Sequence, residues 1–180
     1  MSKKTIESKN PSFIQAINIS NNWCKDWAEE LISDEVLADR LSELISSRNG
    51  LRGFFAYTLS DIECTLLDKL PTSLLFMFIE KGLPVVEITF KNLIMSSAQI
   101  INHNRDKNHA YKEKSEIISE RCTFLLQSLD TKLVTKEAKQ IFKNIDQMGN
   151  SFDNSIKYDQ EQKNFIIQKI NNLAIKKGHI

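Results

Sequence analysis

The chain has very little of the material from which tight turns are made. It contains five glycines and three prolines among 180 residues, and folds with many short strands need far more of both. Apolar residues recur at helical spacing through most of the sequence. The sequence therefore predicts an all-α fold, a single compact multi-helix bundle built from a few long helices.

The domain organisation is expected to be simple. A hydrophobic fraction of 41% is typical of a globular chain with a core of its own, not of a disordered one. We expect residues 1–11 to be a disordered N-terminal tail and residues 12–180 to form a single helical domain. The first residues are basic but lack the apolar core and the cleavage site of a signal peptide.

Capping signals mark several helix starts. Ser12 with Gln15, and Asp159 with Gln162, have the spacing of a capping box, and Ser33 and Thr135 suit N-cap positions. The predicted helices span about residues 12–32, 34–49, 71–81, 84–104, 110–129, 135–148 and 159–177. The pair 71–81 and 84–104 is apolar nearly all round, which predicts the central buried hairpin.

Two segments fit a strand as well as a helix. Residues 53–59 and 84–90 contain β-branched and aromatic residues in partial alternation, and together they could form a short two-stranded β-ribbon. Isolated strand pairs are weak. We therefore favour helix at both places, with the ribbon as the alternative.

The stretch Ser46–Leu59 holds two of the five glycines and two of the five arginines. Gly50 suits the C′ position that ends a helix, and Gly53 suits the restart of the next. The free N–H groups of that next helix, with Arg48 and Arg52, would form a small anion site. The alternative is a capped turn with two solvated arginines.

The charge pattern excludes two kinds of partner. The net charge is +1. The lysines from Lys132 to Lys143 and at Lys176 and Lys177 belong to a carboxy-terminal part that also carries acids, so we expect no nucleic-acid surface. The most apolar span, Leu83–Ile101, is broken by charged and polar residues, so we expect no membrane span. The charge is uneven, with −3 over residues 1–102 and +4 over residues 103–180.

Known catalytic and cofactor motifs are missing from the sequence. There is no phosphate-binding loop, dinucleotide fingerprint, zinc-protease helix, nucleophile elbow or EF-hand loop. Glu113, Glu116 and Glu120 have helical metal-ligand spacing, but a solvated face explains them better. We predict no catalytic residues, no metal and no cofactor, and we lean against an enzyme.

The cysteines and tryptophans are expected to belong to the core. Cys24, Cys64 and Cys122 are odd in number and widely spaced, which favours reduced, buried thiols in a cytoplasmic protein. Trp23 and Trp27 lie one turn apart and are predicted to be core anchors. The alternative is an exposed aromatic patch for a partner.

One set of residues is the candidate for binding a ligand. It joins the arginine turn to a histidine and an arginine that follow the longest apolar helix. The residues are Arg48, Arg52, Gly53, His103 and Arg105.

The segment SDEVLADRLSELISSRNGLRGFFAYTLSD, with LLDKLP and KNLIMSSAQIINHNRD after it, resembles a family of small conserved proteins found across cyanobacteria. The resemblance covers about residues 30–125. It implies a cyanobacterial cytoplasm, and it brings no activity with it.

These observations favour a non-enzymatic helical interaction or regulatory protein that binds another protein. The alternative is a binder of a small anionic ligand, or an enzyme, with its site at the turn 48–53. A homodimer is also possible for a helical chain with so many apolar faces.

Overall fold

A computed structural model describes residues 10–147, 149–150 and 153–175. Their fold is all-α, as predicted, and the chain divides into two compact units, residues 1–81 and 82–180. Each unit is described by itself below, as unit 1 and unit 2. Most of the predicted tail, residues 1–9, lies outside the described residues.

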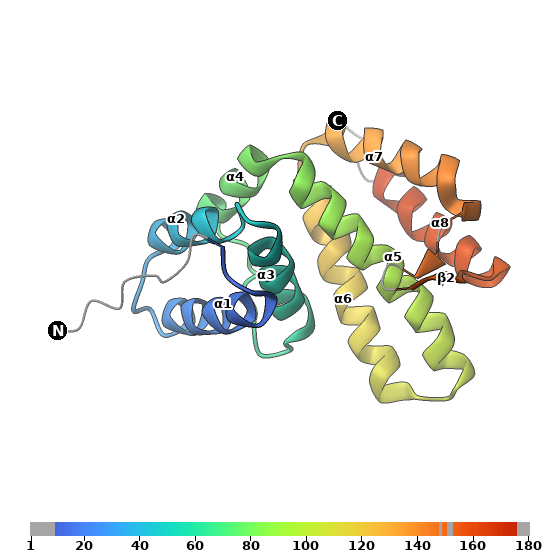
Figure 1. Cartoon of the computed structure of the whole chain (residues 1–180), viewed down its shortest axis with the longest axis horizontal. Helices are drawn as coiled ribbons and strands as arrows, with labels where there is room; N and C mark the ends of the chain where they lie inside the picture. The colour runs from blue at the N-terminus through green and yellow to red at the C-terminus, as the bar shows by residue number, and fades with distance from the viewer. Residues whose placement is uncertain (1–9, 148, 151–152, 176–180) are drawn as a thin grey trace. The chain divides into compact units, whose positions relative to one another are not determined.

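Unit 1 contains four helices, shown in blue to green in Figure 1. Their bounds are α1 Phe13–Ala28, α2 Asp34–Leu44, α3 Arg48–Ser60 and α4 Thr72–Lys81. Helix α1 packs on α3 and α2, and α2 packs on α4. The core between them is aromatic, because the rings of Phe54, Phe55 and Phe78 meet with centroids 5.3–5.9 Å apart and are completely buried.

Unit 2 is built on one long antiparallel pair of helices (Figure 1). Its elements are α5 Leu83–Arg105, α6 His109–Ser128, α7 Thr131–Asn144, the 3-10 turn η1 Ile145–Gln147, β1 Gly149–Asn150, β2 Asp153–Lys157 and α8 Gln160–Ile175. Helices α7 and α8 both pack on α5. Strands β1 and β2 pair antiparallel, with Gly149 opposite Lys157 and Asn150 opposite Asp153.

Both α5 and α6 bury small side chains. Ser96, Ser97 and Ala98 of α5 are buried, as are Ser115 and Ser119 of α6. The hydroxyls of Ser97 and Ser119 are buried without a hydrogen-bond partner. The close packing of the pair therefore outweighs the cost of burying two hydroxyl groups.

The strand alternative is wrong at both segments. Residues 53–59 lie inside α3, and residues 84–90 lie inside α5. Aromatic and β-branched residues occur there because these helices are buried on wide faces, and packing outweighs strand propensity. The strands form instead at 149–150 and 153–157, between the predicted helices 135–148 and 159–177.

The predicted central hairpin of residues 71–81 and 84–104 is also wrong. The chain divides between these two helices, and α5 makes its antiparallel pair with α6. The connector between α5 and α6 is only Asp106–Asn108, where Lys107 has a positive φ of 53°. Such a short link requires antiparallel neighbours.

Three of the predicted caps are confirmed and one is wrong. The hydroxyl of Ser12 accepts from the Gln15 backbone amide, and the side chain of Gln15 accepts from the Ser12 backbone amide, which completes the capping box. Ser33 caps α2. Asp159 and Gln162 bond each other's backbone amides at 3.0 and 2.9 Å. The N-cap of α7 is Asp130, five residues before Thr135, and its carboxylate accepts from the Leu133 amide at 2.9 Å.

Candidate functional site

The candidate site in unit 1 is set by where α3 begins. Helix α2 ends at Leu44, and Ser47 caps α3, its hydroxyl accepting from the Gly50 amide at 3.0 Å. Gly50 is thus the third residue of α3, and the predicted stop at Gly50 with a restart at Gly53 is wrong. The earlier start puts Arg48 and Arg52 on the first two turns of one continuous helix.

The glycines of α3 are needed for close approach, not for unusual backbone angles. A Cβ on Gly50 would lie 1.8 Å from the Leu44 carbonyl oxygen. A Cβ on Gly53 would lie 2.5 Å from the Ala16 Cβ and 2.9 Å from the Phe13 carbonyl oxygen. Only glycine allows α3 to lie against α1 at this distance.

Helix α1 carries the matching surface. Ala16, Ser20 and Cys24 recur every four residues and are all buried, so they form a stripe of small side chains along one side of α1. The hydroxyl of Ser20 donates to the Ala16 carbonyl at 2.8 Å and needs no other partner. This spacing is the sequence signal that could have revealed the close contact with α3.

The crossing of α1 and α3 fixes one arginine on an aromatic ring. The guanidinium of Arg52 lies 5.3 Å from the centroid of the Phe13 ring, and both side chains are half-buried. Arg48 lies one turn earlier and is exposed, as is Asn49. We call Phe13, Arg48, Asn49 and Arg52 the arginine face.

The arginine face is cationic and has no internal counter-charge. No ion pair joins Arg48 or Arg52 to a carboxylate among the described residues. Stacking on Phe13 replaces the carboxylate that would otherwise orient Arg52, and such contacts contribute about 0.5–1 kcal/mol at exposed sites. The face can therefore offer two cations to an anionic group, and Phe13 orients one of them, Arg52.

The other two predicted ligand residues lie in unit 2. Arg105, at the end of α5, makes ion pairs with Asp159, at 2.6 Å, and with Glu161. These contacts raise the pKa of Arg105, and Arg105 in turn lowers the pKa of Asp159 to about 2. Its guanidinium thus holds the start of α8 to the end of α5.

His103 is half-buried on the last turns of α5, with its ring centroid 5.6 Å from that of Tyr111. The structure brings Arg48, Arg52 and Gly53 together on α3, and it brings His103 and Arg105 together at the end of α5. A site that joins all five residues stays a prediction.

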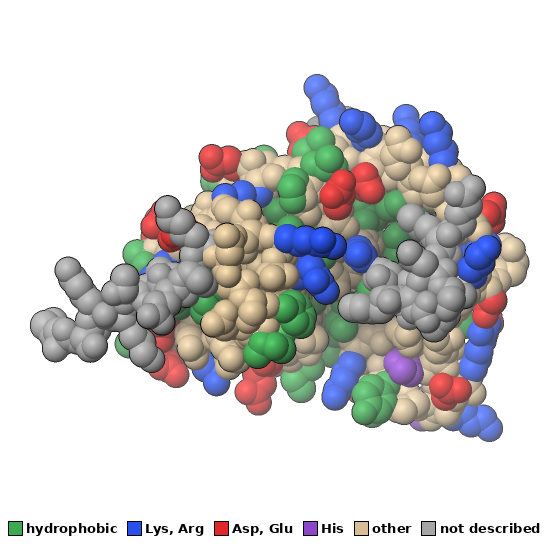
Figure 2. Space-filling model, viewed as in Figure 1, with side chains coloured by type: hydrophobic (Ala, Val, Ile, Leu, Met, Phe, Trp, Pro, Cys, Tyr) green, Lys and Arg blue, Asp and Glu red, His purple; other side chains and the backbone are tan. Residues whose placement is uncertain are grey.

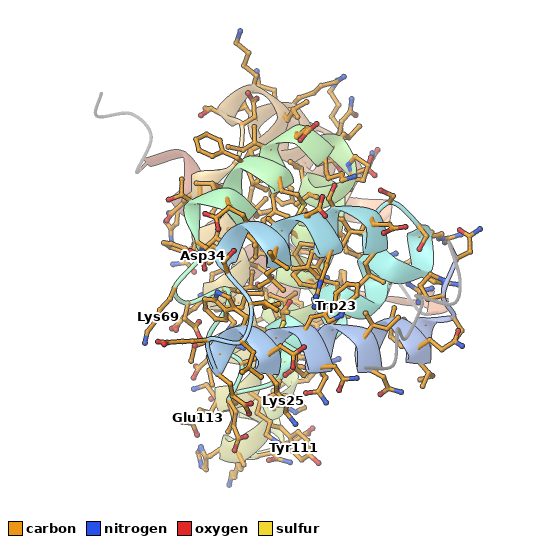
Figure 3. All side chains as sticks on the ribbon, turned by 90° about the vertical axis from the view of Figure 1, so that its left-hand side faces the viewer. Trp23, Lys25, Asp34, Lys69, Tyr111 and Glu113 are labelled. Carbon is orange, nitrogen blue, oxygen red and sulfur yellow. The ribbon has the colours of Figure 1, made fainter. Side chains whose placement is uncertain are left out.

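The two tryptophans lie on the side of α1 that faces α2. The indole N–H of Trp27 donates to Asp34 at 2.7 Å, and the guanidinium of Arg40 lies 6.0 Å from the Trp23 ring centroid. Figure 3 shows Trp23 between the two helices. Both indoles are half-buried, so they anchor α2 on α1 and keep only an edge in solvent.

Cys24, Cys64 and Cys122 are all buried, as predicted, and no disulfide joins them to one another. A side-chain hydrogen bond with Cys64, followed by burial, raises the pKa of the Cys24 thiol. Burial alone raises the pKa of Cys122. Thiols with raised pKa values are poor nucleophiles, so these two sulfurs are suited to packing.

No group of three or more His, Cys, Asp or Glu side chains within the described residues could hold a metal ion. Glu116, one of the three glutamates with metal-ligand spacing, pairs instead with Lys112 at 3.7 Å on the same helix.

The profile of one protein family covers nearly all of the described chain. The uncharacterised conserved protein family UCP020893 matches residues 12–173. The chain belongs to this family. No curated protein and no solved structure matches it. The resemblance to a small conserved family is thereby confirmed, and the cyanobacterial source stays a prediction.

The match of family UCP020893 begins at Ser12, the cap of α1, and ends at Leu173, the last buried residue described in α8. It therefore includes the arginine face and both units. None of the helices in the described part of the chain has the length and apolar character to cross a bilayer.

Proposed function

We propose that the chain is a non-enzymatic helical protein that binds another protein through the arginine face. The observation that carries the proposal is the pair Arg52 and Phe13, a guanidinium held on a half-exposed ring with no carboxylate partner among the described residues. Arginine and aromatic side chains dominate the binding energy of protein interfaces. An arginine already oriented by stacking loses less conformational entropy on binding.

The surroundings of the arginine face support a protein partner. Ile14 follows Phe13 and is 62% exposed, which adds apolar area to the two cations. A surface of this kind fits a partner segment that combines a carboxylate with an apolar residue. The partner would place the carboxylate between Arg48 and Arg52.

Affinity capture with the full chain tests this proposal. Wild type is compared with Arg48→Glu/Arg52→Glu and with Lys25→Glu, a control reversal at an exposed position of α1. We expect one partner protein at stoichiometric amount with wild type and with the control, and at least a tenfold loss with the double variant. Absence of any stoichiometric partner with wild type would overturn the proposal.

A second variant separates charge from stacking. Arg52→Lys keeps the positive charge but loses the planar group that lies on Phe13. We expect Arg52→Lys to weaken capture of the partner, but by less than Arg48→Glu/Arg52→Glu does. Equal capture by Arg52→Lys and wild type would show that only charge matters, and the stacked pair would not be the basis of recognition.

The second candidate function is binding of a small anionic ligand at the same place. It is favoured by the amino end of α3, where the amides of Arg48 and Asn49 have no protein acceptor among the described residues and both arginine side chains are close. Backbone N–H groups and the helix dipole attract anions there. A thermal-shift screen with inorganic phosphate and phosphorylated metabolites tests it, and a shift that Arg48→Glu abolishes would favour it.

We also propose that the protein works in the cytoplasm of a cyanobacterium. Buried cysteines that form no disulfide with one another support a reducing compartment, and the motif string of residues 30–125 supports the source. Fractionation of cells that express a tagged chain tests the compartment.

A further inference from the structure

The outer face of α7 carries a straight row of cations. Lys132, Lys136, Lys139 and Lys143 are all exposed, and their steps of four, three and four residues keep them within an arc of about 60° on a helix. The row is about 16 Å long. We call these four residues the lysine stripe, and Figure 2 shows Lys and Arg side chains gathered along the outer edge of α7.

The lysine stripe is not neutralised by its own helix. The one acidic residue inside α7, Glu137, is half-buried, and burial followed by the charge of Glu87 on α5 raises its pKa, while the charge of Lys136 lowers it. Glu137 therefore lies between α5 and the stripe and makes no ion pair with any of the four lysines. None of the four lysines has an ion pair among the described residues.

Helix α2 in unit 1 carries the opposite charge with nearly the same repeat. Glu35, Asp39 and Glu43 are exposed and follow one another in steps of four. None of these carboxylates has an ion pair among the described residues. The three residues, called the acidic stripe, lie within an arc of about 80° on α2.

The two units also differ in net charge. Unit 1 has 9 basic and 12 acidic side chains, a net charge of −3, and unit 2 has 15 basic and 11 acidic side chains, a net charge of +4.

The spacing suits a helix better than the other anionic partners. Two steps along the acidic stripe span eight residues, and two steps along the lysine stripe span seven, a difference of about 1.5 Å. A lysine stem easily absorbs that difference. A bilayer would need a whole apolar helix face to insert, but Val134 and Ile141 are buried in packing, and Phe142, 37% exposed, is a single exposed large apolar side chain on α7. Single-stranded nucleic acid would need several aromatic or arginine side chains for stacking, and beside the stripe α7 offers only the ring of Phe142.

We propose that α7 of one molecule docks on α2 of a second copy of this chain, with the lysine stripe facing the acidic stripe. Two different faces meet in this contact. It is therefore made twice in a closed two-fold dimer, or it repeats from head to tail in a longer assembly. The proposal does not use the arginine face, so it stands or fails separately from the proposed function.

The test is the mass of the full chain by light scattering as salt and sequence are varied. At about 50 mM salt, wild type should have a mass above that of the 20.7 kDa chain, rising with concentration. The mass should return to that of the monomer near 500 mM salt, where charges are screened over a few ångströms. Lys136→Glu/Lys139→Glu should weaken association at least tenfold.

A matched control and a charge swap make the test specific. Lys91→Glu/Lys114→Glu changes the net charge equally at exposed positions outside the stripe and should associate like wild type. Asp39→Lys/Glu43→Lys should be monomeric alone and should form a one-to-one complex when mixed with Lys136→Glu/Lys139→Glu. Circular dichroism should show all variants folded, since every position is exposed.

Three results would overturn the proposal. The first is a monomeric wild-type mass at every salt concentration, which would leave the stripes unpaired or paired within one molecule. The second is failure of the swapped variants to associate with each other. The third is binding of monomeric wild type to phosphatidylserine vesicles or to duplex DNA through the lysine stripe, which would assign the stripe to a different partner.

Discussion

At the scale of single residues, the neighbours Gly53 and Arg52 have different roles: Gly53 packs against α1, and Arg52 lies on the surface that could bind a partner. Gly53 lets the backbone of α3 come within van der Waals distance of α1, and this approach brings the Arg52 side chain over Phe13. The packing of the unit and the orientation of the candidate binding residue thus depend on the same contact. A side chain at position 53 would disturb both.

We predict that Gly53→Ala destabilises unit 1. Alanine favours helix by about 1 kcal/mol, whereas overpacking costs typically 1–3 kcal/mol. The Cβ would meet backbone atoms of α1, which cannot move aside, so we expect a cost of about 2–3 kcal/mol and a net loss of about 1–2 kcal/mol. Urea unfolding followed by tryptophan fluorescence measures it, because both tryptophans of the chain lie on α1.

Two further variants make the Gly53 prediction specific. Asn49→Ala, at an exposed position of the same helix, should change stability by less than about 0.5 kcal/mol. Adding Ala16→Gly to Gly53→Ala removes the 2.5 Å contact and should restore part of the loss. A Gly53→Ala variant as stable as wild type would contradict the close packing.

The Arg105–Asp159 contact predicts that the stability of unit 2 changes with pH in the acidic range. The pKa of Asp159 falls from 3.8 to about 2 in the folded state, first because of Arg105. Between about pH 4 and pH 2 the unfolded chain binds more protons than the folded one, so stability is lost as the pH falls through this window. Thermal melts followed by circular dichroism at pH 5, 4, 3 and 2.5 measure the loss.

Arg105→Ala should flatten this acid dependence. It should not abolish it, because the Gln162 amide also lowers the pKa of Asp159. Lys114→Ala, which removes an exposed cation that lies over Tyr111, should keep the full dependence. Identical pH profiles for wild type and Arg105→Ala would show that the contact does not persist in solution.

At the scale of elements, the start of α3 decides what the arginine face is. Ser47 caps α3, and a second serine, Ser46, donates instead to the Ser42 carbonyl of α2 and accepts from Lys81. The boundary between the helices therefore lies at these two serines. Ser46 bonds to the last turn of α2, and Ser47 caps the first turn of α3. With this start, both arginines belong to one rigid surface.

Replacing the cap tests where α3 starts. Ser47→Ala should destabilise unit 1 by about 1 kcal/mol, because the Gly50 amide loses its acceptor. Ser47→Asp, which can also accept at an N-cap and adds a charge favourable to the helix dipole, should be close to wild type. Tryptophan fluorescence in urea again reports the result. Equal stability of all three proteins would place the helix start elsewhere.

The helices were more predictable from the sequence than their contacts were. Capping boxes at Ser12 and Asp159 are local patterns, so their positions followed directly. Asn49-Gly50 has the local pattern of a helix stop, and only the approach of the Leu44 carbonyl shows why glycine is there. The stacking of Arg52 on Phe13 joins residues far apart in sequence, so no local pattern reveals it.

The lysine stripe was partly predictable. The four lysines recur at helical spacing in the sequence, but acids in the same part of the chain suggested a mixed surface. Asp130 caps α7 and Glu137 lies between α5 and the stripe, and neither makes an ion pair with the four lysines. Both facts depend on tertiary packing.

At the scale of the whole molecule, the chain is two helical units of opposite net charge, and the match to its family spans most of each. Unit 1 presents the arginine face and the acidic stripe, and unit 2 presents the lysine stripe. Both proposed contacts are therefore made by exposed helix faces. We propose above all that the arginine face contacts a partner protein.

The most direct measurement of this claim is photo-crosslinking in living cells of the source organism. A photoreactive amino acid is placed at Asn49, between the two arginines, and in a separate chain at Asn18, which is exposed on α1 outside the arginine face. We expect one discrete adduct with a partner protein at position 49 and none at position 18. No adduct at position 49, or the same adducts at both positions, would contradict it.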